Sequence, residues 1–189
     1  YGVTLGNSLR RVLLSSIEGS AVTAIKIAGI SHEFSTIPGV LEDVPEIILN
    51  IKSIVLNSHS KIPKTIYLKA DKKGVVKAKD IQADETIEII NPELHIATLT
   101  KDTKLNIEME VSRGRGYVAG ELNKREDKTA GFIAIDSIFT PIKKINYFVE
   151  NTRVGQRTDY DKLILEIWTN GSINPKDALL YASNILQRH

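Results

Sequence analysis

The sequence contains no cysteine, one methionine and one tryptophan among its 189 residues. The absence of cysteine excludes disulfide bonds, thiolate zinc sites and cysteine nucleophiles. No apolar run approaches the roughly 20 residues needed to span a bilayer, and no secretory signal is visible. Because 25 basic residues stand against 23 acidic ones, the chain also lacks the cationic excess of a dedicated nucleic-acid clamp. Composition therefore predicts a globular cytoplasmic protein without membrane contact.

Apolar residues recur with helical spacing near both ends of the chain. A first helix is predicted from Thr4 to Gly19, and a last helix begins at Asn174-Pro175, which supply its cap and first residue. The two apolar stripes are Leu5, Leu9, Val12, Leu13 and Ile17 on the first helix, and Ala178, Leu179, Ala182, Ile185 and Leu186 on the last.

Each terminal helix also carries apolar residues beyond its stripe. These are Leu14, beside Arg11, on the first helix, and Leu180 and Tyr181 on the last. A helix that buries more than one side is either central in a core or part of an interface. The pattern alone leaves both readings open.

The region between these helices has the periodicity of β-strands. The cleanest alternation runs from Lys104 to Val111 and places Leu105, Ile107, Met109 and Val111 on the inner face. Other strands are predicted at 21–30, 65–69, 86–90, 95–99, 144–149 and 162–168, with one helix at 43–55 capped by Asp43 and an exposed loop at 121–129.

This order predicts an α+β fold with two domains. Two amphipathic helices would pack on an antiparallel sheet, and a β-rich domain would be inserted between them. The expected boundaries are 1–18 plus 142–189 for the discontinuous domain and 19–141 for the insert. The chain begins without Met and stops inside its last helix, so we expect a longer natural protein.

No catalytic constellation is found. The four histidines (His32, His59, His95 and His189) have no neighbours at metal-ligand spacing. Asp159 and Asp161 could hold a divalent metal, although a solvated turn explains them more simply. We therefore expect no catalytic residue, cofactor or metal site.

The segment Arg113–Tyr117, RGRGY, could be a phosphate-cradling loop or an RNA contact. Its simpler reading is a glycine-permitted turn closing a β-hairpin, with Arg115 and Tyr117 on the surface. The residues favour an interaction protein. A small RNA-binding or divalent-metal-dependent module is the alternative.

Several segments of the chain resemble those of a known family. They include Gly2–Ser16 (GVTLGNSLRRVLLSS), Glu33–Thr36 (EFST), Gly39–Val44 (GVLEDV), Arg113–Tyr117 (RGRGY), Ile135–Ser137 (IDS) and Arg153–Leu163 (RVGQRTDYDKL). Their sequence and order resemble the alpha subunit of bacterial-type DNA-directed RNA polymerase. The resemblance covers nearly the whole chain, although the family's leading strand and C-terminal DNA-binding domain are not among these 189 residues.

The resemblance implies a non-catalytic scaffold in a nucleotidyltransferase complex for DNA-templated transcription. In this family, the first and last helices of two subunits form a homodimer that docks the beta and then the beta-prime subunit. The catalytic magnesium and the nucleotide chemistry belong to those large subunits, and DNA would be met only indirectly through the complex.

Site residues follow from matched positions. Arg11 matches an arginine needed for beta docking, with Leu14 beside it. Lys52 and Ile135 match positions implicated in binding beta-prime. The resemblance implies a dimer interface lined by Leu5, Leu9, Val12, Leu13, Leu179, Ala182, Ile185 and Leu186.

Overall fold

The computed structural model describes residues 1–124 and 131–188, which form two compact units. Unit 1 comprises Tyr1–Glu18 and Thr140–His189, and unit 2 comprises Gly19–Phe139. The fold is α+β with antiparallel strand pairing, which confirms the expected fold class. No helix in the described part of the chain is long and apolar enough to cross a membrane.

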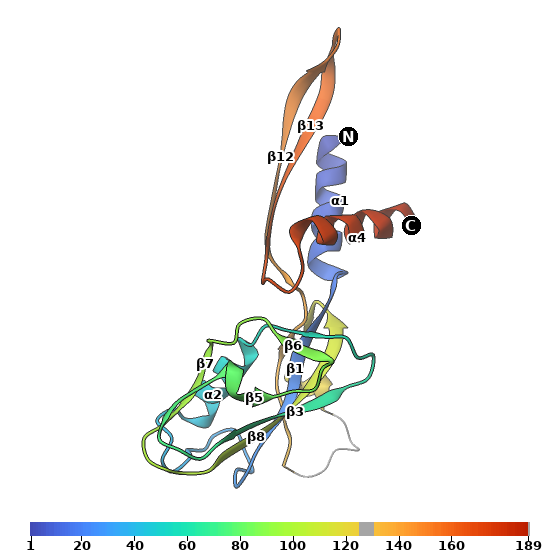
Figure 1. Cartoon of the computed structure of the whole chain (residues 1–189). Helices are drawn as coiled ribbons and strands as arrows, with labels where there is room; N and C mark the ends of the chain where they lie inside the picture. The colour runs from blue at the N-terminus through green and yellow to red at the C-terminus, as the bar shows by residue number, and fades with distance from the viewer. Residues whose placement is uncertain (125–130, 189) are drawn as a thin grey trace. The chain divides into compact units, whose positions relative to one another are not determined.

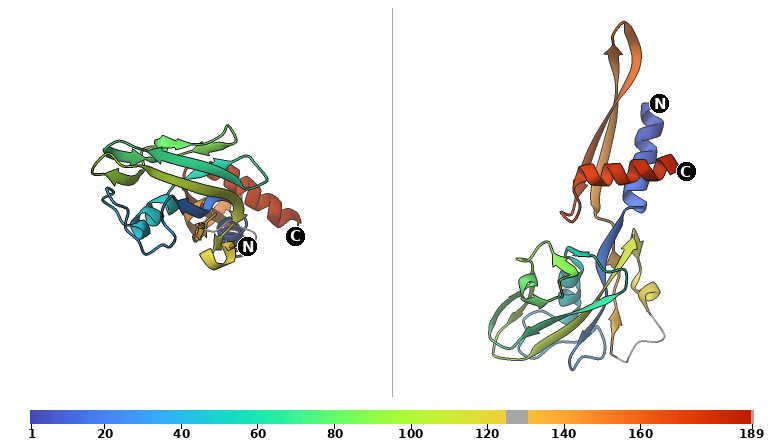
Figure 2. Two further views of the ribbon diagram at one scale, coloured as in Figure 1. Left: turned by 90° about the horizontal axis from the view of Figure 1, so that it is seen from below. Right: turned by 45° about the vertical axis from the view of Figure 1, so that its right-hand side comes forward.

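Unit 1 consists of two helices and one long hairpin (Figure 1). The elements are α1 (Gly2–Ser15), β12 (Ile142–Val154), β13 (Arg157–Thr169) and α4 (Pro175–Arg188). The strands β12 and β13 pair antiparallel from Ile142 opposite Thr169 to Val154 opposite Arg157. Helix α1 contacts this hairpin, and α4 packs on α1 and crosses it in the right view of Figure 2. The predicted packing of the terminal helices against each other is therefore present.

Two glycines allow α1 to approach the hairpin closely. A Cβ atom on Gly6 would lie 2.5 Å from Cδ2 of Tyr147, and one on Gly2 would lie 2.7 Å from Cγ1 of Val149. Any larger residue at either position would push the helix away from β12. The first of these contacts places a glycine one turn into α1 directly over an aromatic ring.

The start of α1 differs from the sequence-based expectation. The helix begins at Gly2 rather than Thr4, because the Asp161 carboxylate accepts a 2.8 Å hydrogen bond from the Gly2 N–H. It ends at Ser15, so that Ile17 and Gly19 lie outside it. The contact that fixes the start joins residues far apart in sequence, and no local pattern contains it.

Unit 2 is built on a five-stranded sheet with the order β10-β1-β8-β3-β5. These strands are β1 (Glu18–Ile27), β3 (Lys64–Ala70), β5 (Ile81–Gln82), β8 (Leu105–Arg115) and β10 (Ile133–Ala134). Unit 2 also contains three two-stranded antiparallel sheets. They pair β2 (Leu56–Ser58) with β6 (Ile87–Ile89), β4 (Gly74–Lys77) with β7 (His95–Leu99), and β9 (Tyr117–Val118) with β11 (Ser137–Ile138). The remaining elements are α2 (Val44–Lys52), the 3-10 helix η1 (Ala78–Asp80) and α3 (Gly120–Asn123).

The core of unit 2 lies between this sheet and α2. All four residues predicted on the inner face of β8 are buried, as are Val44, Ile47 and Ile51 of α2. The predicted cap of α2 is confirmed, because Asp43 Oδ1 accepts the Glu46 N–H at 2.9 Å. The helix ends at Lys52 rather than at residue 55, since Val55 donates its N–H to Asn91 and accepts from Ile90.

The RGRGY segment does not close the predicted hairpin. Strand β8 continues to Arg115, Gly116 turns the chain at φ +62°, and β9 then pairs with β11. Arg115 and Tyr117 are exposed, as expected. Part of the predicted 121–129 loop forms α3, and positions 125–129 fall outside the described residues.

Candidate protein-interaction surfaces

One side of α1 places an arginine and a leucine next to each other in solvent. Arg11 and Leu14 are three residues apart and lie on neighbouring turns of the helix. Arg11 is exposed and has no ion-pair partner within residues 1–124 and 131–188, and Leu14 retains 37% exposure. Val3, about three turns earlier, lies on the same side and is also exposed. This surface offers five donors beside apolar area.

Val3 is a residue that the sequence reasoning missed. The apolar periodicity predicts a helix that starts at Thr4, which leaves Val3 outside it. The matched family motif begins at Gly2, and this is the sequence signal that could have indicated an earlier start of the helix. Val3 adds a second exposed apolar residue to the side of α1 that carries Arg11 and Leu14.

The eight residues predicted to line a dimer interface fall into three groups. Leu13 and Ala182 are fully buried in the core of unit 1, together with Ile17, Ile142, Ile145 and Ala178. Leu5 is 53% exposed. The half-buried group is Leu9, Val12, Leu179, Ile185 and Leu186.

Leu13 and Ala182 are therefore removed from the predicted interface. A side chain with no accessible surface cannot contact a second subunit, and both residues instead hold α1 and α4 together. Leu180 and Tyr181, which the sequence placed outside the stripe of α4, are 62% and 65% exposed. The apolar surface of unit 1 is thus carried by half-buried and exposed positions on both helices.

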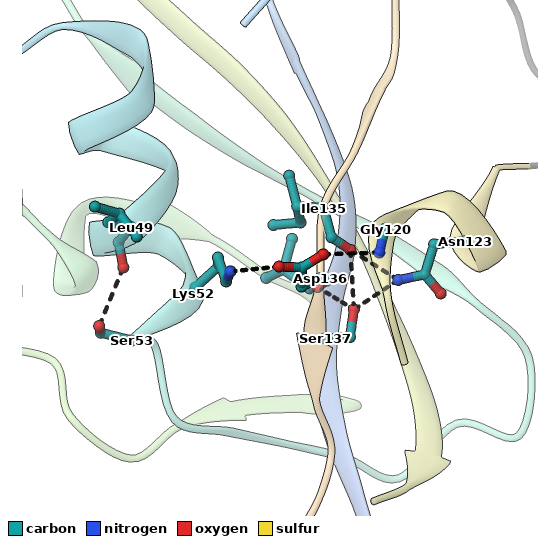
Figure 3. Close-up of polar contacts among 9 residues, drawn as sticks. Leu49, Lys52, Ser53, Gly120, Asn123, Ile135, Asp136 and Ser137 are labelled. Carbon is teal, nitrogen blue, oxygen red and sulfur yellow. Dashed lines mark hydrogen bonds and ion pairs between the residues drawn. The ribbon is translucent and has the colours of Figure 1, made fainter. Parts of the chain in front are cut away.

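A second surface surrounds an ion pair in unit 2 (Figure 3). The Lys52 ammonium at the end of α2 lies 3.0 Å from Oδ2 of Asp136. The other oxygen of Asp136 accepts the Gly120 N–H at 2.8 Å. This backbone hydrogen bond, followed by the one from Lys52, holds the pKa of Asp136 below its ordinary value. The carboxylate therefore joins α2, α3 and the segment between β10 and β11.

A hydrogen-bond network fixes the backbone on both sides of Asp136. The Asn123 amide donates to the Ile135 carbonyl at 2.8 Å and lies 2.9 Å from the Ser137 hydroxyl (Figure 3). The buried Ser137 hydroxyl donates in turn to the Val22 carbonyl of β1 at 2.8 Å. Asp136 thus lies in a segment held by hydrogen bonds on both sides, and its side chain is 41% exposed.

Ile135 does not lie on this surface. Its side chain is 4% exposed and belongs to the core of unit 2, so we remove it from the predicted beta-prime contact. The residue that the sequence reasoning missed is its neighbour Asp136, which stands in the same matched motif, Ile135-Asp136-Ser137. Leu49, on the same helix as Lys52, is also exposed. The surface therefore combines Lys52, Asp136 and Leu49.

A buried carboxylate fixes the chain ahead of α2. Glu42, 6% exposed, accepts hydrogen bonds from the Thr98 N–H at 2.6 Å, the Thr98 hydroxyl at 3.0 Å and His95 Nε2 at 2.7 Å. Burial acts to raise the pKa of Glu42, but these hydrogen bonds outweigh it and hold the pKa below the ordinary value. The cluster ties the segment before α2 to β7.

The two alternative sites have other structural roles. Asp161 is engaged at the start of α1, while Asp159 is exposed. Within residues 1–124 and 131–188, no three His, Asp or Glu side chains come together as metal ligands would. In the RGRGY segment, a Cβ on Gly114 would lie 2.8 Å from the Phe139 ring. Close packing on Phe139 is thus a structural reason for a glycine there.

The sequence is similar to that of a known family and to named proteins. The family described as "RNA polymerase Rpb3/RpoA insert domain" matches residues 25–140. A protein of Desulfitobacterium hafniense (strain DSM 10664 / DCB-2) is 60% identical over all 189 residues. Proteins of Moorella thermoacetica and Symbiobacterium thermophilum are 59% and 56% identical over the same length. Each of the three is named "DNA-directed RNA polymerase subunit alpha", and this chain spans 60% of its length.

Proposed function

Since this chain belongs to the alpha-subunit family of bacterial-type DNA-directed RNA polymerase, we propose that it is the part of such a subunit that scaffolds assembly. In this proposal, unit 1 forms a homodimer, and each copy offers surfaces to the beta and beta-prime subunits. The chain contributes no catalytic residue, metal or cofactor to the nucleotidyltransferase, and it works in the cytoplasm. Unit 1 is the dimerisation domain and unit 2 is the insert.

The observation that carries this proposal is the imbalance of apolar residues in unit 1. Only six apolar residues form its buried core, whereas Leu5, Leu180 and Tyr181 are each more than half exposed. Small cores stabilise a fold only marginally, and large apolar side chains left exposed on the same unit are available to a partner. A second copy is the proposed occupant because both exposed helices belong to the unit that the family resemblance assigns to dimerisation.

Sedimentation tests the dimer. Over a hundredfold range of concentration, we expect the chain to sediment as a dimer that dissociates only at the lowest concentrations. Leu5→Asp places a charge in the proposed interface and should give a monomer. Leu122→Asp is the matched control, because Leu122 is an exposed leucine of unit 2. A monomeric wild-type chain at every concentration would refute the dimer.

Co-purification tests the beta contact. Arg11→Ala should abolish capture of the beta subunit, because it removes the guanidinium, while the sedimenting dimer is retained. Arg10→Ala, at the adjacent exposed arginine of the same helix, should still capture beta. If Arg11→Ala loses both beta and the dimer, Arg11 supports folding and not docking.

The beta-prime contact is tested on the preformed complex of alpha with beta. Lys52→Ala should weaken addition of beta-prime and leave the earlier complex intact. Lys79→Ala is the control, since Lys79 is an exposed lysine of unit 2 that also pairs with a carboxylate, Glu93. Unchanged addition of beta-prime to the Lys52→Ala complex would remove Lys52 from this surface.

A further inference from the structure

Two neighbouring connections in unit 2, together with the end of β3, gather five lysines. One connection joins β3 to β4 and the other joins β7 to β8. They lie side by side because Ala70 pairs with Leu105 and Gly74 pairs with Leu99. The Lys73 N–H also donates to Asp102 Oδ1 at 2.9 Å, which joins the two turns directly. We name this surface the lysine ridge, formed by Lys69, Lys72, Lys73, Lys101 and Lys104.

The ridge is cationic and its charges are available. All five lysines are exposed, and none forms an ion pair within the described residues, unlike Lys64, Lys77 and Lys79 of the same unit. The acidic residues within the two segments are Asp71 and Asp102, so that the local formal charge is five minus two, or +3. The whole chain carries only +2. Its positive charge is therefore concentrated on this surface.

The form of the ridge suits a chain of repeated anions. Lys69 and Lys104 line a shallow hollow of about 370 Å³ with Ala70, Asp71 and Asn106, and the other three lysines extend from the adjoining turns. Lysine ammonium groups are flexible point charges that bind phosphate without demanding a fixed geometry. The five ridge positions include no arginine, and the Tyr67 ring lies 5.8 Å from the Lys69 ammonium. Such a surface favours contact with the phosphate backbone of a nucleic acid over contact with its base edges.

We propose that the lysine ridge is a sequence-independent contact for the phosphodiester backbone of nucleic acid. This goes beyond the scaffold function and differs from the expectation that DNA is met only indirectly. It rests on the proposed function in one respect, since a subunit of a DNA-directed polymerase works beside both DNA and RNA. Near-neutral total charge argues against a dedicated clamp, and a local ridge of this size fits an auxiliary contact.

Fluorescence anisotropy with a labelled DNA duplex of mixed sequence tests the proposal. We expect weak binding by the chain, on the order of 10⁻⁴–10⁻⁶ M at physiological salt, with no sequence preference. If four to five lysines contact phosphates, affinity should fall roughly several-hundredfold between 50 and 200 mM salt. A single-stranded RNA probe should also bind, with a shallower slope of about 0.7 per contact instead of 0.9.

The decisive comparison uses two variants of equal net charge. One replaces the five ridge lysines by glutamine, and the other replaces the exposed Lys61, Lys79, Lys143, Lys162 and Lys176. Each changes the formal charge from +2 to −3. The ridge variant should lose the salt-dependent binding while the control keeps most of it. The single variants Lys101→Gln and Lys104→Gln should each lower the slope by about one, which covers the case of a ridge variant that fails to fold.

Three results would overturn the proposal. An equal loss of nucleic-acid binding in both five-lysine variants would assign the binding to the total charge of the chain. If the wild-type chain does not bind either probe at 50 mM salt, the ridge is not a nucleic-acid contact. Preference for poly-glutamate over both nucleic-acid probes would assign the ridge to an acidic protein. Sedimentation of the ridge variant separates this proposal from the scaffold function, because the variant should still dimerise.

Discussion

Adjacent residues of α1 have different roles, and Leu13 and Leu14 show this directly. Leu13 is fully buried in the core of unit 1, while Leu14 retains 37% exposure beside Arg11. One step along the helix turns the side chain by about 100°, from the core to solvent. The exposure of Leu14 is therefore available to a partner, whereas the burial of Leu13 stabilises the protomer.

Replacing each leucine by alanine should separate these roles. Leu13→Ala leaves a cavity and should lower the free energy of unfolding by about 2–5 kcal/mol. Leu14→Ala should change it by less than about 1 kcal/mol but weaken capture of the beta subunit. Denaturant titration at one protein concentration measures the first effect and co-purification the second. Similar destabilisation by both substitutions would contradict the assignment.

Glu42 makes the stability of the fold depend on pH in the acidic range. Its pKa is lowered in the folded state, against an ordinary value of 4.5. A carboxyl group whose pKa is lowered in the folded state stabilises the fold at pH values above its ordinary pKa. This contribution is lost as the pH falls through the folded-state pKa. Glu42→Gln should therefore be destabilised relative to wild type at pH 7, by about 1–3 kcal/mol.

The difference between Glu42→Gln and wild type should shrink as the pH falls from 5 toward 3. Denaturant titrations at several pH values measure it. Glu88→Gln serves as the control, because Glu88 is an exposed glutamate of the same unit and should behave as wild type throughout. A difference that stays constant across this range would show that the charge of Glu42 is not what stabilises the segment.

At the scale of elements, the sequence predicted types better than boundaries. The alternation of β8 and the Asp43 cap of α2 are confirmed, because both depend on residues adjacent in sequence. The start of α1 was wrong because Asp161, far along the chain, satisfies its first N–H. The predicted hairpin at Arg113–Tyr117 was also wrong, since Gly116 permits a turn but does not determine which strand β9 pairs with.

The same reason explains the candidate surfaces. The family motif located Lys52 and Arg11, but only the fold shows that Ile135 faces the core and that Asp136 faces Lys52. The lysine ridge could not be found by pattern, because 69–73 and 101–104 meet only through the pairing of four strands. Sequence periodicity gives the side of an element, and the fold decides what lies opposite.

The packing of α1 on the hairpin provides a test at this scale. Gly6→Ala would gain about 1 kcal/mol of helix propensity. The added Cβ would, however, stand 2.5 Å from the Tyr147 ring and 3.0 Å from Leu163 Cδ1, so we expect a net loss of stability. Asn7→Ala, on the exposed side of the same turn, should be neutral or slightly stabilising. Thermal unfolding measures both, and a stabilised Gly6→Ala would show that the helix is not tightly seated.

For the whole molecule, the two units have very different means of stabilisation. Unit 2 has an extensive core formed by its sheet and α2, whereas the buried core of unit 1 has six residues. If unit 1 is completed by a second copy, its stability depends on protein concentration, and that of unit 2 does not. The only tryptophan, Trp168, lies in β13 and therefore reports on unit 1.

Unfolding followed by Trp168 fluorescence should therefore depend on concentration. A hundredfold increase in the chain should stabilise the dimer by RT ln 100, about 2.7 kcal/mol, and move the denaturant midpoint upward. Far-UV circular dichroism, which also reports the sheet of unit 2, should contain a second transition whose midpoint does not move. In Leu5→Asp, the fluorescence midpoint should become independent of concentration and match that of the dilute wild type. A fluorescence midpoint that stays fixed in the wild type would mean that the small core of unit 1 is sufficient by itself, and the reason for assigning its exposed leucines to a second subunit would be removed.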